Sequence, residues 1–113
     1  MKNYDEVTEW LFSQLPVYQN QGAKAYKPGL GKIEAFARHL GNPHASFPSV
    51  HVAGTNGKGS TLIFIKNIME GYGLKVHCYT SPHLIRFNER IVLSNKQIHD
   101  DVLFNTLNEV IKI

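Results

Sequence analysis

Apolar residues spaced three and four positions apart predict four helices along this chain. The first helix is expected over residues 4–15, where acidic side chains occupy the first turn and a proline follows directly. The second is expected over residues 33–40, before a Gly-Asn-Pro stop. The third covers residues 60–72, and its apolar residues form more than one stripe, which predicts a helix packed in the interior. The fourth begins near Asp100.

Three short runs favour β-strands, at residues 50–53, 75–80 and 89–93. The first two flank the third helix, and a strand-helix-strand order predicts a right-handed parallel crossover. In such a unit the loop that follows the first strand lies at the carboxyl edge of the sheet, where ligands bind. Residues 16–31 are polar and contain glycine, so we expect an extended loop there.

The composition is that of one soluble α/β domain, with 113 residues, 42% hydrophobic and 19% charged. The single cysteine, Cys78, has no partner in the chain for a disulfide or a metal site, so a reducing compartment, the cytoplasm, is expected. The N-terminus lacks the order of a signal peptide, and no apolar run is long enough for a membrane segment.

The net charge of +3 suits an anionic ligand, although surplus lysines on a small chain are also typical of a solvated surface. No arginine-rich run or basic stripe with interleaved aromatics occurs, so nucleic-acid binding is not expected. The histidines are scattered and lack metal-ligand spacing, so no zinc site is expected, and Trp10 is assigned to packing.

A glycine-rich segment between the first predicted strand and the third helix carries the strongest chemical signal. Glycines let successive backbone N–H groups point inward, and the positive end of the following helix adds to their field. Lys58 is placed to reach the outer phosphates, and the hydroxyl of Ser60 or Thr61 to meet a metal or phosphate oxygen. The pattern predicts a site for ATP with Mg²⁺, formed by Gly54, Thr55, Asn56, Gly57, Lys58, Gly59, Ser60 and Thr61. A glycine-rich turn with an incidental lysine is the alternative.

The spacing differs from that of the common phosphate loop, because Gly54 is only three residues before Gly57. The run 53–61 resembles the ATP loop of the Mur ligase superfamily, specifically that of folylpolyglutamate and dihydrofolate synthases. The run 79–84, followed by 87–91, is similar to the second signature of that family. Residues 30–33 are similar to a weaker motif before the loop.

The resemblance implies an ATP- and Mg²⁺-dependent ligase that joins L-glutamate to folate or dihydropteroate through an acyl phosphate. Phosphoryl transfer needs charge neutralisation more than covalent help, so Lys58 is expected to have the catalytic role. By the same resemblance Ser81 is a magnesium ligand, and the position of Ser60 in the glycine-rich loop makes it the other candidate. An ordinary turn serine is the alternative for Ser81. The family also contacts its substrate near Tyr26, Lys27 and Pro28, and Arg86 and Arg90 are candidates to face a carboxylate or phosphate. A solvated surface pair is equally consistent for the two arginines.

The expected fold is part of a three-layer α/β domain around a P-loop-type parallel sheet, formed by residues 1–113 as one truncated N-terminal portion. The last predicted helix is still in phase at Ile113, and the family's further metal ligands and glutamate domain are not found before it. We therefore expect this chain alone to be inactive and, with sheet and helix faces uncovered, to self-associate. Another Mur-type ligase and a nucleotide-binding module without turnover remain alternatives. Addition of the first glutamate and chain extension are not distinguished.

Overall fold

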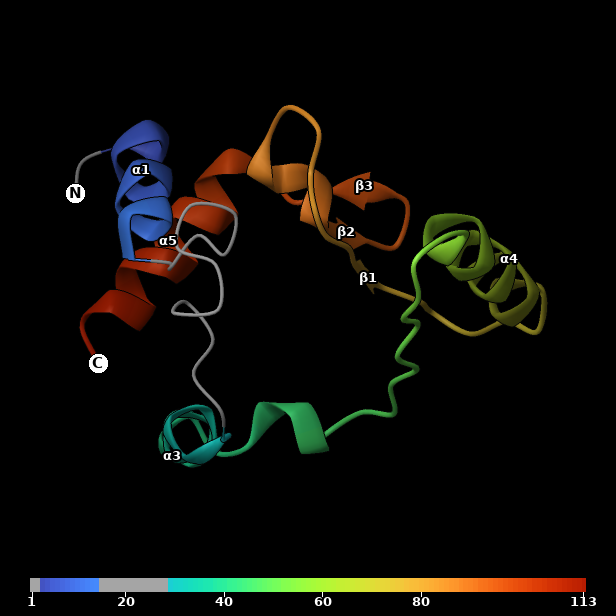
Figure 1. Ribbon diagram of the computed structural model, residues 1–113, viewed down its shortest axis with the longest axis horizontal. Coiled ribbons are helices and arrows are strands. Elements are labelled where there is room, and N and C mark those ends of the chain that lie inside the picture. The colour runs from blue at the N-terminus through green and yellow to red at the C-terminus, as the bar shows by residue number, and fades with distance from the viewer. Residues whose placement is uncertain (1–2, 15–28) are drawn as a thin grey trace. The chain divides into compact units, whose positions relative to one another are not determined.

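A computed structural model of the chain describes residues 3–14 and 29–113 (Figure 1). The chain divides into two compact units, a larger one of Met1–Leu15 with Ala53–Ile113 and a smaller one of Pro16–Val52. The predicted substrate residues Tyr26, Lys27 and Pro28 lie outside the described residues. Each unit is described by itself.

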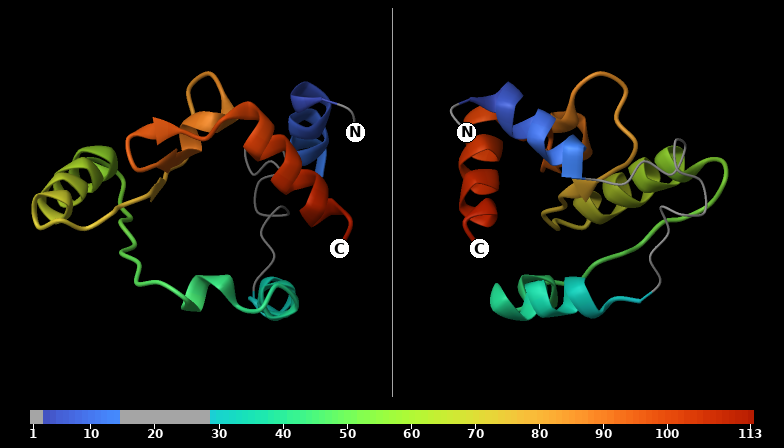
Figure 2. Two further views of the ribbon diagram at one scale, coloured as in Figure 1. Left: turned by 180° about the vertical axis from the view of Figure 1, so that it is seen from behind. Right: turned by 60° about the vertical axis from the view of Figure 1, so that its left-hand side comes forward.

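Two helices from opposite ends of the sequence pack together in the larger unit. Helices α1 (Tyr4–Gln14) and α5 (Asp100–Ile111) lie side by side in both views of Figure 2. Each contributes a buried apolar side chain, Val7 from α1 and Leu103 from α5. Full burial of one such side chain stabilises a fold by about 1.5–3 kcal/mol. Both helices confirm the predicted periodicity.

The sheet of the larger unit has three short antiparallel strands in the order β1-β2-β3. Strand β1 (Cys78–Tyr79) pairs with β2 (Ile91–Leu93), with Cys78 opposite Val92, and β2 pairs with β3 (Lys96–Gln97). A short 3₁₀ helix, η3 (Phe87–Arg90), precedes β2. It includes residues 89 and 90, the first two residues of the predicted strand 89–93, whereas the last three form β2. The backbone N–H of Thr80 donates to the carbonyl of Arg90 at 2.8 Å and extends the pairing of β1 with β2.

The described residues form helices and a short antiparallel sheet, not the predicted parallel sheet. No strand covers residues 50–53, and residues 75–80 form strand only at β1. A strand needs a neighbour to satisfy its backbone groups. Residues 50–53 straddle the boundary between the two units and have no such neighbour in the described ranges, whereas β1 finds its partner in the hairpin that follows.

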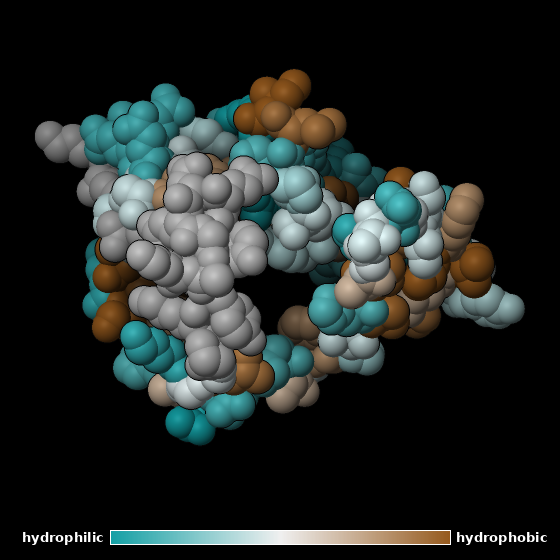
Figure 3. All heavy atoms as spheres, in the orientation of Figure 1, coloured by the Kyte–Doolittle hydropathy of each residue, from teal (hydrophilic) through white to brown (hydrophobic). Residues whose placement is uncertain are grey.

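Helix α4 (Lys58–Gly71) confirms the third predicted helix but not its predicted interior position. None of its residues is buried, and Phe64 remains 66% exposed. Figure 3 shows apolar surface over the region of α4. A side-chain bond from Lys66 to Asn95, at 2.9 Å, joins the helix to the turn between β2 and β3. No helix in the described ranges is long and apolar enough to cross a bilayer.

The smaller unit contains α3 (Gly31–His39) and the 3₁₀ helix η2 (Pro43–Ala45). Asn42, with φ of 52°, makes the left-handed turn between them. Helix α3 confirms the second predicted helix and ends before the predicted Gly-Asn-Pro stop.

Candidate nucleotide-binding site

The glycine-rich loop turns into α4 through a residue in the left-handed region. Gly57 is the N-cap of the helix, with φ of 73° and ψ of 8°. L-residues with a side chain rarely adopt this conformation, so the turn favours glycine. The loop residues before Gly57 and the first helical turn after it are all exposed to solvent. The structure therefore has the predicted turn into a helix, but not the predicted strand before the loop.

The first turn of α4 has backbone donors without partners. The N–H of Thr61 donates to the carbonyl of Gly57 at 3.0 Å and is the first bond of the helix. No side chain caps this end, and within the described residues no acceptor is present for the N–H groups of Lys58, Gly59 and Ser60. Unpaired N–H groups and the helix dipole together attract anions.

Lys58 folds back over the loop. Its ammonium group donates to the carbonyl oxygen of Gly54, at the start of the glycine-rich segment. The positive charge is therefore held at the glycine-rich loop, at whose end the helix begins, and it stays exposed to solvent. An anion with several charges would find both kinds of donor within one loop.

Ser60 and Ser81 are exposed, and neither hydroxyl makes a hydrogen bond to another described residue. Such oxygens suit Mg²⁺, which prefers hard oxygen ligands and keeps several of its waters. No cluster of three or more histidine, cysteine or acidic side chains that could hold a metal occurs in residues 3–14 and 29–113. A magnesium ion here would therefore depend on these hydroxyls and on phosphate oxygens. Ser81 follows β1 and precedes Pro82 through a cis peptide bond.

Three backbone N–H groups of the loop after Ser81 meet one carboxylate. Glu89 of η3 accepts backbone hydrogen bonds from Leu84 at 3.0 Å, Ile85 at 2.9 Å and Arg86 at 2.6 Å. The bond from the Arg86 amide, followed by those from Leu84 and Ile85, lowers the pKa of Glu89 below its ordinary value. Glu89 is thus ionised at neutral pH and shaped to hold a turn.

Arg86 is paired inside the protein. Its guanidinium donates to both carboxylate oxygens of Asp100, at 2.9 and 2.8 Å, and lies 4.9 Å from the centre of the Tyr4 ring. The hydrogen bond between them raises the pKa of Arg86 and lowers that of Asp100. Asn88, 2% exposed, also donates to Asp100 at 2.8 Å. That Arg86 faces a ligand stays a prediction. In this structure Asp100 neutralises the charge of Arg86 through an ion pair.

Arg90 points to a small aromatic cluster. Its Nε donates to Nδ1 of His83 at 2.7 Å, and its guanidinium carbon lies 5.4 Å from the centre of the Phe87 ring. The rings of Phe12, His83 and Phe87 lie within 6.0 Å of one another, centre to centre. A cavity of about 270 Å³ opens between α1 and this loop. A ligand role for Arg90 likewise stays a prediction.

Sequence reasoning did not anticipate the roles of Asn88, Glu89 and Asp100. In the sequence, Asn88 and Glu89 belong to a run that resembles a family signature, and that resemblance assigns them no role. One local signal was available: Glu89 stands three residues after Arg86, the spacing at which a glutamate accepts the backbone N–H at the start of a helical turn. The partnership with Asp100 crosses two strands and has no local signal.

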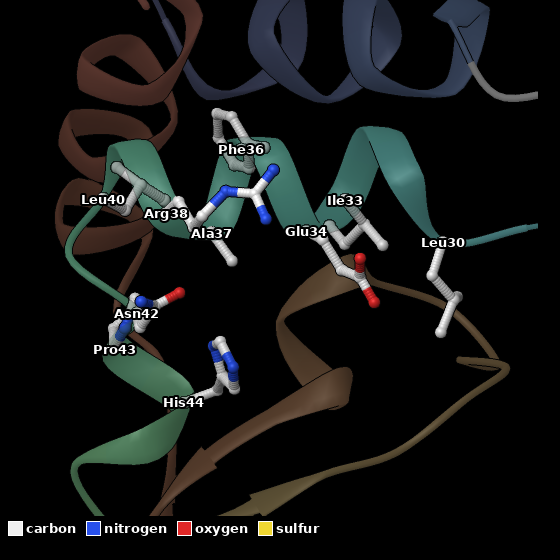
Figure 4. A pocket seen from close by; sticks show the side chains of 10 residues that line it. All are labelled: Leu30, Ile33, Glu34, Phe36, Ala37, Arg38, Leu40, Asn42, Pro43 and His44. Carbon is white, nitrogen blue, oxygen red and sulfur yellow. The ribbon is translucent and has the colours of Figure 1, made fainter.

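A larger concavity belongs to the smaller unit and contains none of the predicted site residues. Its volume is about 750 Å³, and α3 and η2 line it together with the turn between them. Figure 4 shows its lining, which is mostly apolar, with Glu34 and His44 among the few polar side chains. Its lining includes one cation, Arg38, and one carboxylate, Glu34.

No protein-family model matches the chain. Curated relatives do match it. The dihydrofolate synthase/folylpolyglutamate synthase of Bacillus subtilis (strain 168) is 36% identical over 107 residues, which are 95% of this chain and 23% of the relative. The folylpolyglutamate synthase of Lacticaseibacillus casei is 47% identical over 76 residues, or 67% of this chain and 18% of the relative.

Solved structures agree. The folylpolyglutamate synthetase from Lactobacillus casei superposes with a TM-score of 0.81 at 35% identity, over 97% of this chain and 26% of that one. The folylpolyglutamate synthase from Thermotoga maritima gives 0.75 at 34% identity, over 96% and 24%. Another such structure, with a TM-score of 0.78, is a complex with AMPPCP and folate. The chain thus spans about a quarter of the length of these proteins, and over that quarter it belongs to the folylpolyglutamate synthase/dihydrofolate synthase family.

Proposed function

We propose that residues 54–61 bind the phosphates of ATP, with Lys58 neutralising the charge of the outer phosphates. The observation that carries the proposal is that the Lys58 ammonium is bonded to Gly54 at the start of the loop, while the first-turn amides at its end have no partner in the described residues. One short segment thus carries both a positive side chain and free backbone N–H groups, the two features that attract phosphate. The complex of a related enzyme with AMPPCP, an ATP analogue by name, supports the same ligand.

We further propose that the protein to which this segment corresponds is an ATP- and Mg²⁺-dependent ligase. It would join L-glutamate to the carboxylate of folate or dihydropteroate, which is first activated as an acyl phosphate. The names of the relatives and the folate in one related complex support this substrate class. Ser60 and Ser81 would hold Mg²⁺, and the ion would neutralise part of the charge of the phosphates. The chain's own residues would orient the nucleotide and neutralise its charge, the main demands of phosphoryl transfer.

A titration of Mg-ATP into this chain, measured by calorimetry, tests the loop. Lys58→Ala should weaken binding at least about tenfold, since it removes a charged contact to phosphate. The control is Lys75→Ala, which removes the same charge from an exposed position after α4. Equal affinities for the wild type and Lys58→Ala, or a larger loss with Lys75→Ala, would contradict the proposal.

Four narrower proposals concern the fold, the location, the activity and the self-association of the chain. We expect residues 50–53 to become a parallel strand beside residues 75–80 when the rest of the family fold is present. We expect the protein to be located in the cytoplasm. We expect no ligation by the 113 residues alone, and incorporation of labelled glutamate into a folate by the purified chain would refute this. We also expect self-association through the exposed apolar surface of α4, which sedimentation would detect.

A further inference from the structure

The tip of the loop that carries Ser81 has little apolar support, although His83 packs against the rings of Phe12 and Phe87. Residues 81–86 form neither helix nor strand, and the side chains at its tip are among the most exposed in the described residues, Leu84 at 92% and Ile85 at 87%. Apolar burial therefore does not fix the path of its tip. Polar contacts must do so, because an exposed loop without them samples many conformations.

Glu89 supplies the central polar contacts. One of its oxygens accepts from Leu84 and the other from Ile85 and Arg86, so three consecutive amides converge on one carboxylate. Bonds to an ionised acceptor are stronger than neutral ones. Both oxygens are occupied by the loop, so Glu89 is shaped to hold the backbone rather than a ligand.

The carboxylate is itself anchored to the packed part of the larger unit. Its neighbour Asn88 is buried and donates to the carbonyl of Ile98 at 2.8 Å and to Asp100 at 2.8 Å, while the Tyr4 hydroxyl donates to it. Asn88 thereby ties η3 to α1 and to the start of α5. A continuous set of bonds runs from these helices through η3 and Glu89 to the loop.

We propose that Glu89 is a positioning residue, which fixes the loop after β1 so that Ser81 can take part in magnesium-dependent nucleotide binding. This inference rests on the proposed function, in which Ser81 is a ligand of Mg²⁺. Glu89 acts through the backbone of residues 84–86 and touches neither nucleotide nor metal. The glycine-rich loop before α4 is a separate segment and does not depend on it.

The test compares the wild-type chain with Glu89→Gln. Glutamine has nearly the same shape, but its NH₂ group would face at least one of the three backbone N–H groups, which needs an acceptor. The matched control is Glu109→Gln, which neutralises an exposed carboxylate on α5. Two quantities are measured: amide hydrogen exchange at Leu84, Ile85 and Arg86 by NMR, and affinity for ATP with magnesium and with EDTA.

For Glu89→Gln, we expect exchange at the three amides to accelerate about tenfold or more, because charge-assisted bonds are lost. Affinity for Mg-ATP should fall by about tenfold, while affinity for ATP in EDTA stays within about twofold, since the glycine-rich loop is intact. Glu109→Gln should change neither quantity. The ATP affinity in EDTA also verifies the fold, because an unfolded variant would lose both affinities.

The outcomes separate this inference from the proposed function. Unchanged exchange, or unchanged Mg-ATP affinity in a variant whose loop has loosened, would overturn the role of Glu89. If the wild type binds ATP equally with and without magnesium, the magnesium site of the proposed function fails. Exchange at residues 84–86 then decides alone whether Glu89 fixes the loop.

Discussion

Alanine at Gly57 and at Gly59 should change the stability of α4 in opposite directions. A Cβ at either position meets no atom within 4 Å, so neither substitution creates a steric clash in the free protein. The difference lies in the backbone. Gly57 has φ of 73°, where an alanine costs about 1–2 kcal/mol. Gly59 is the second residue of the helix, and in a helix alanine is favoured over glycine by about 0.5–1 kcal/mol.

Urea unfolding followed by circular dichroism measures this difference, which should total about 1.5–3 kcal/mol between the two variants. Equal shifts of the two unfolding midpoints would refute the assignment of Gly57 to a left-handed turn.

The same pair separates stability from binding. A loop that grips phosphate through its backbone needs the close approach that glycine allows. Gly59→Ala should therefore bind Mg-ATP more weakly although its helix is more stable, as calorimetry would detect. Wild-type affinity in Gly59→Ala would refute a close approach of phosphate to the backbone at this position.

Three further predictions concern the support of the larger unit. Asn88→Ala should destabilise it by about 2–3 kcal/mol in urea unfolding, because the buried bonds to Ile98 and Tyr4 lose their partner; a change below about 0.5 kcal/mol would contradict this. Val7→Ala should cost about 2 kcal/mol in the same assay, from lost burial and a residual cavity, and a neutral effect would mean that α1 does not pack as described. Because the pKa values of Glu89 and Asp100 are lowered in the folded state, their contribution is complete above the ordinary carboxyl range and is lost as pH falls through the lowered values. An acid-unfolding curve that is unchanged by Glu89→Gln would disagree.

The helices could be predicted because their signals are local. Neighbouring residues carry the apolar spacing of 4–15, 33–40 and 100–113 and the stops after the first two, and the structure places helices there. The glycine-rich loop was predictable for the same reason, since Gly57 and the start of α4 are adjacent in sequence.

The strands and the interior could not be predicted in the same way. A β-favouring run such as residues 50–53 becomes a strand only beside a partner, and the described residues provide none. Residues 89–93 favoured strand throughout, yet Glu89 and Arg90 lie in η3, where Glu89 serves the preceding loop. Arg86 was expected to face solvent or a ligand, and only the chain's return at Asp100 supplied its partner.

If residues 54–61 bind nucleotide as proposed, the uncapped start of α4 would couple the conformation of this segment to its ligand. The helix buries none of its residues, and no described side chain accepts from the backbone N–H groups of its first turn. An anion bound there supplies the missing acceptors, so occupancy and helix content are thermodynamically linked. At a free nucleotide concentration 100 times the dissociation constant, this linkage stabilises the folded state by about 2.7 kcal/mol. Because α4 is so lightly packed, the nucleotide concentration would determine the fraction of chains in which α4 is folded as well as the fraction of loops that are occupied.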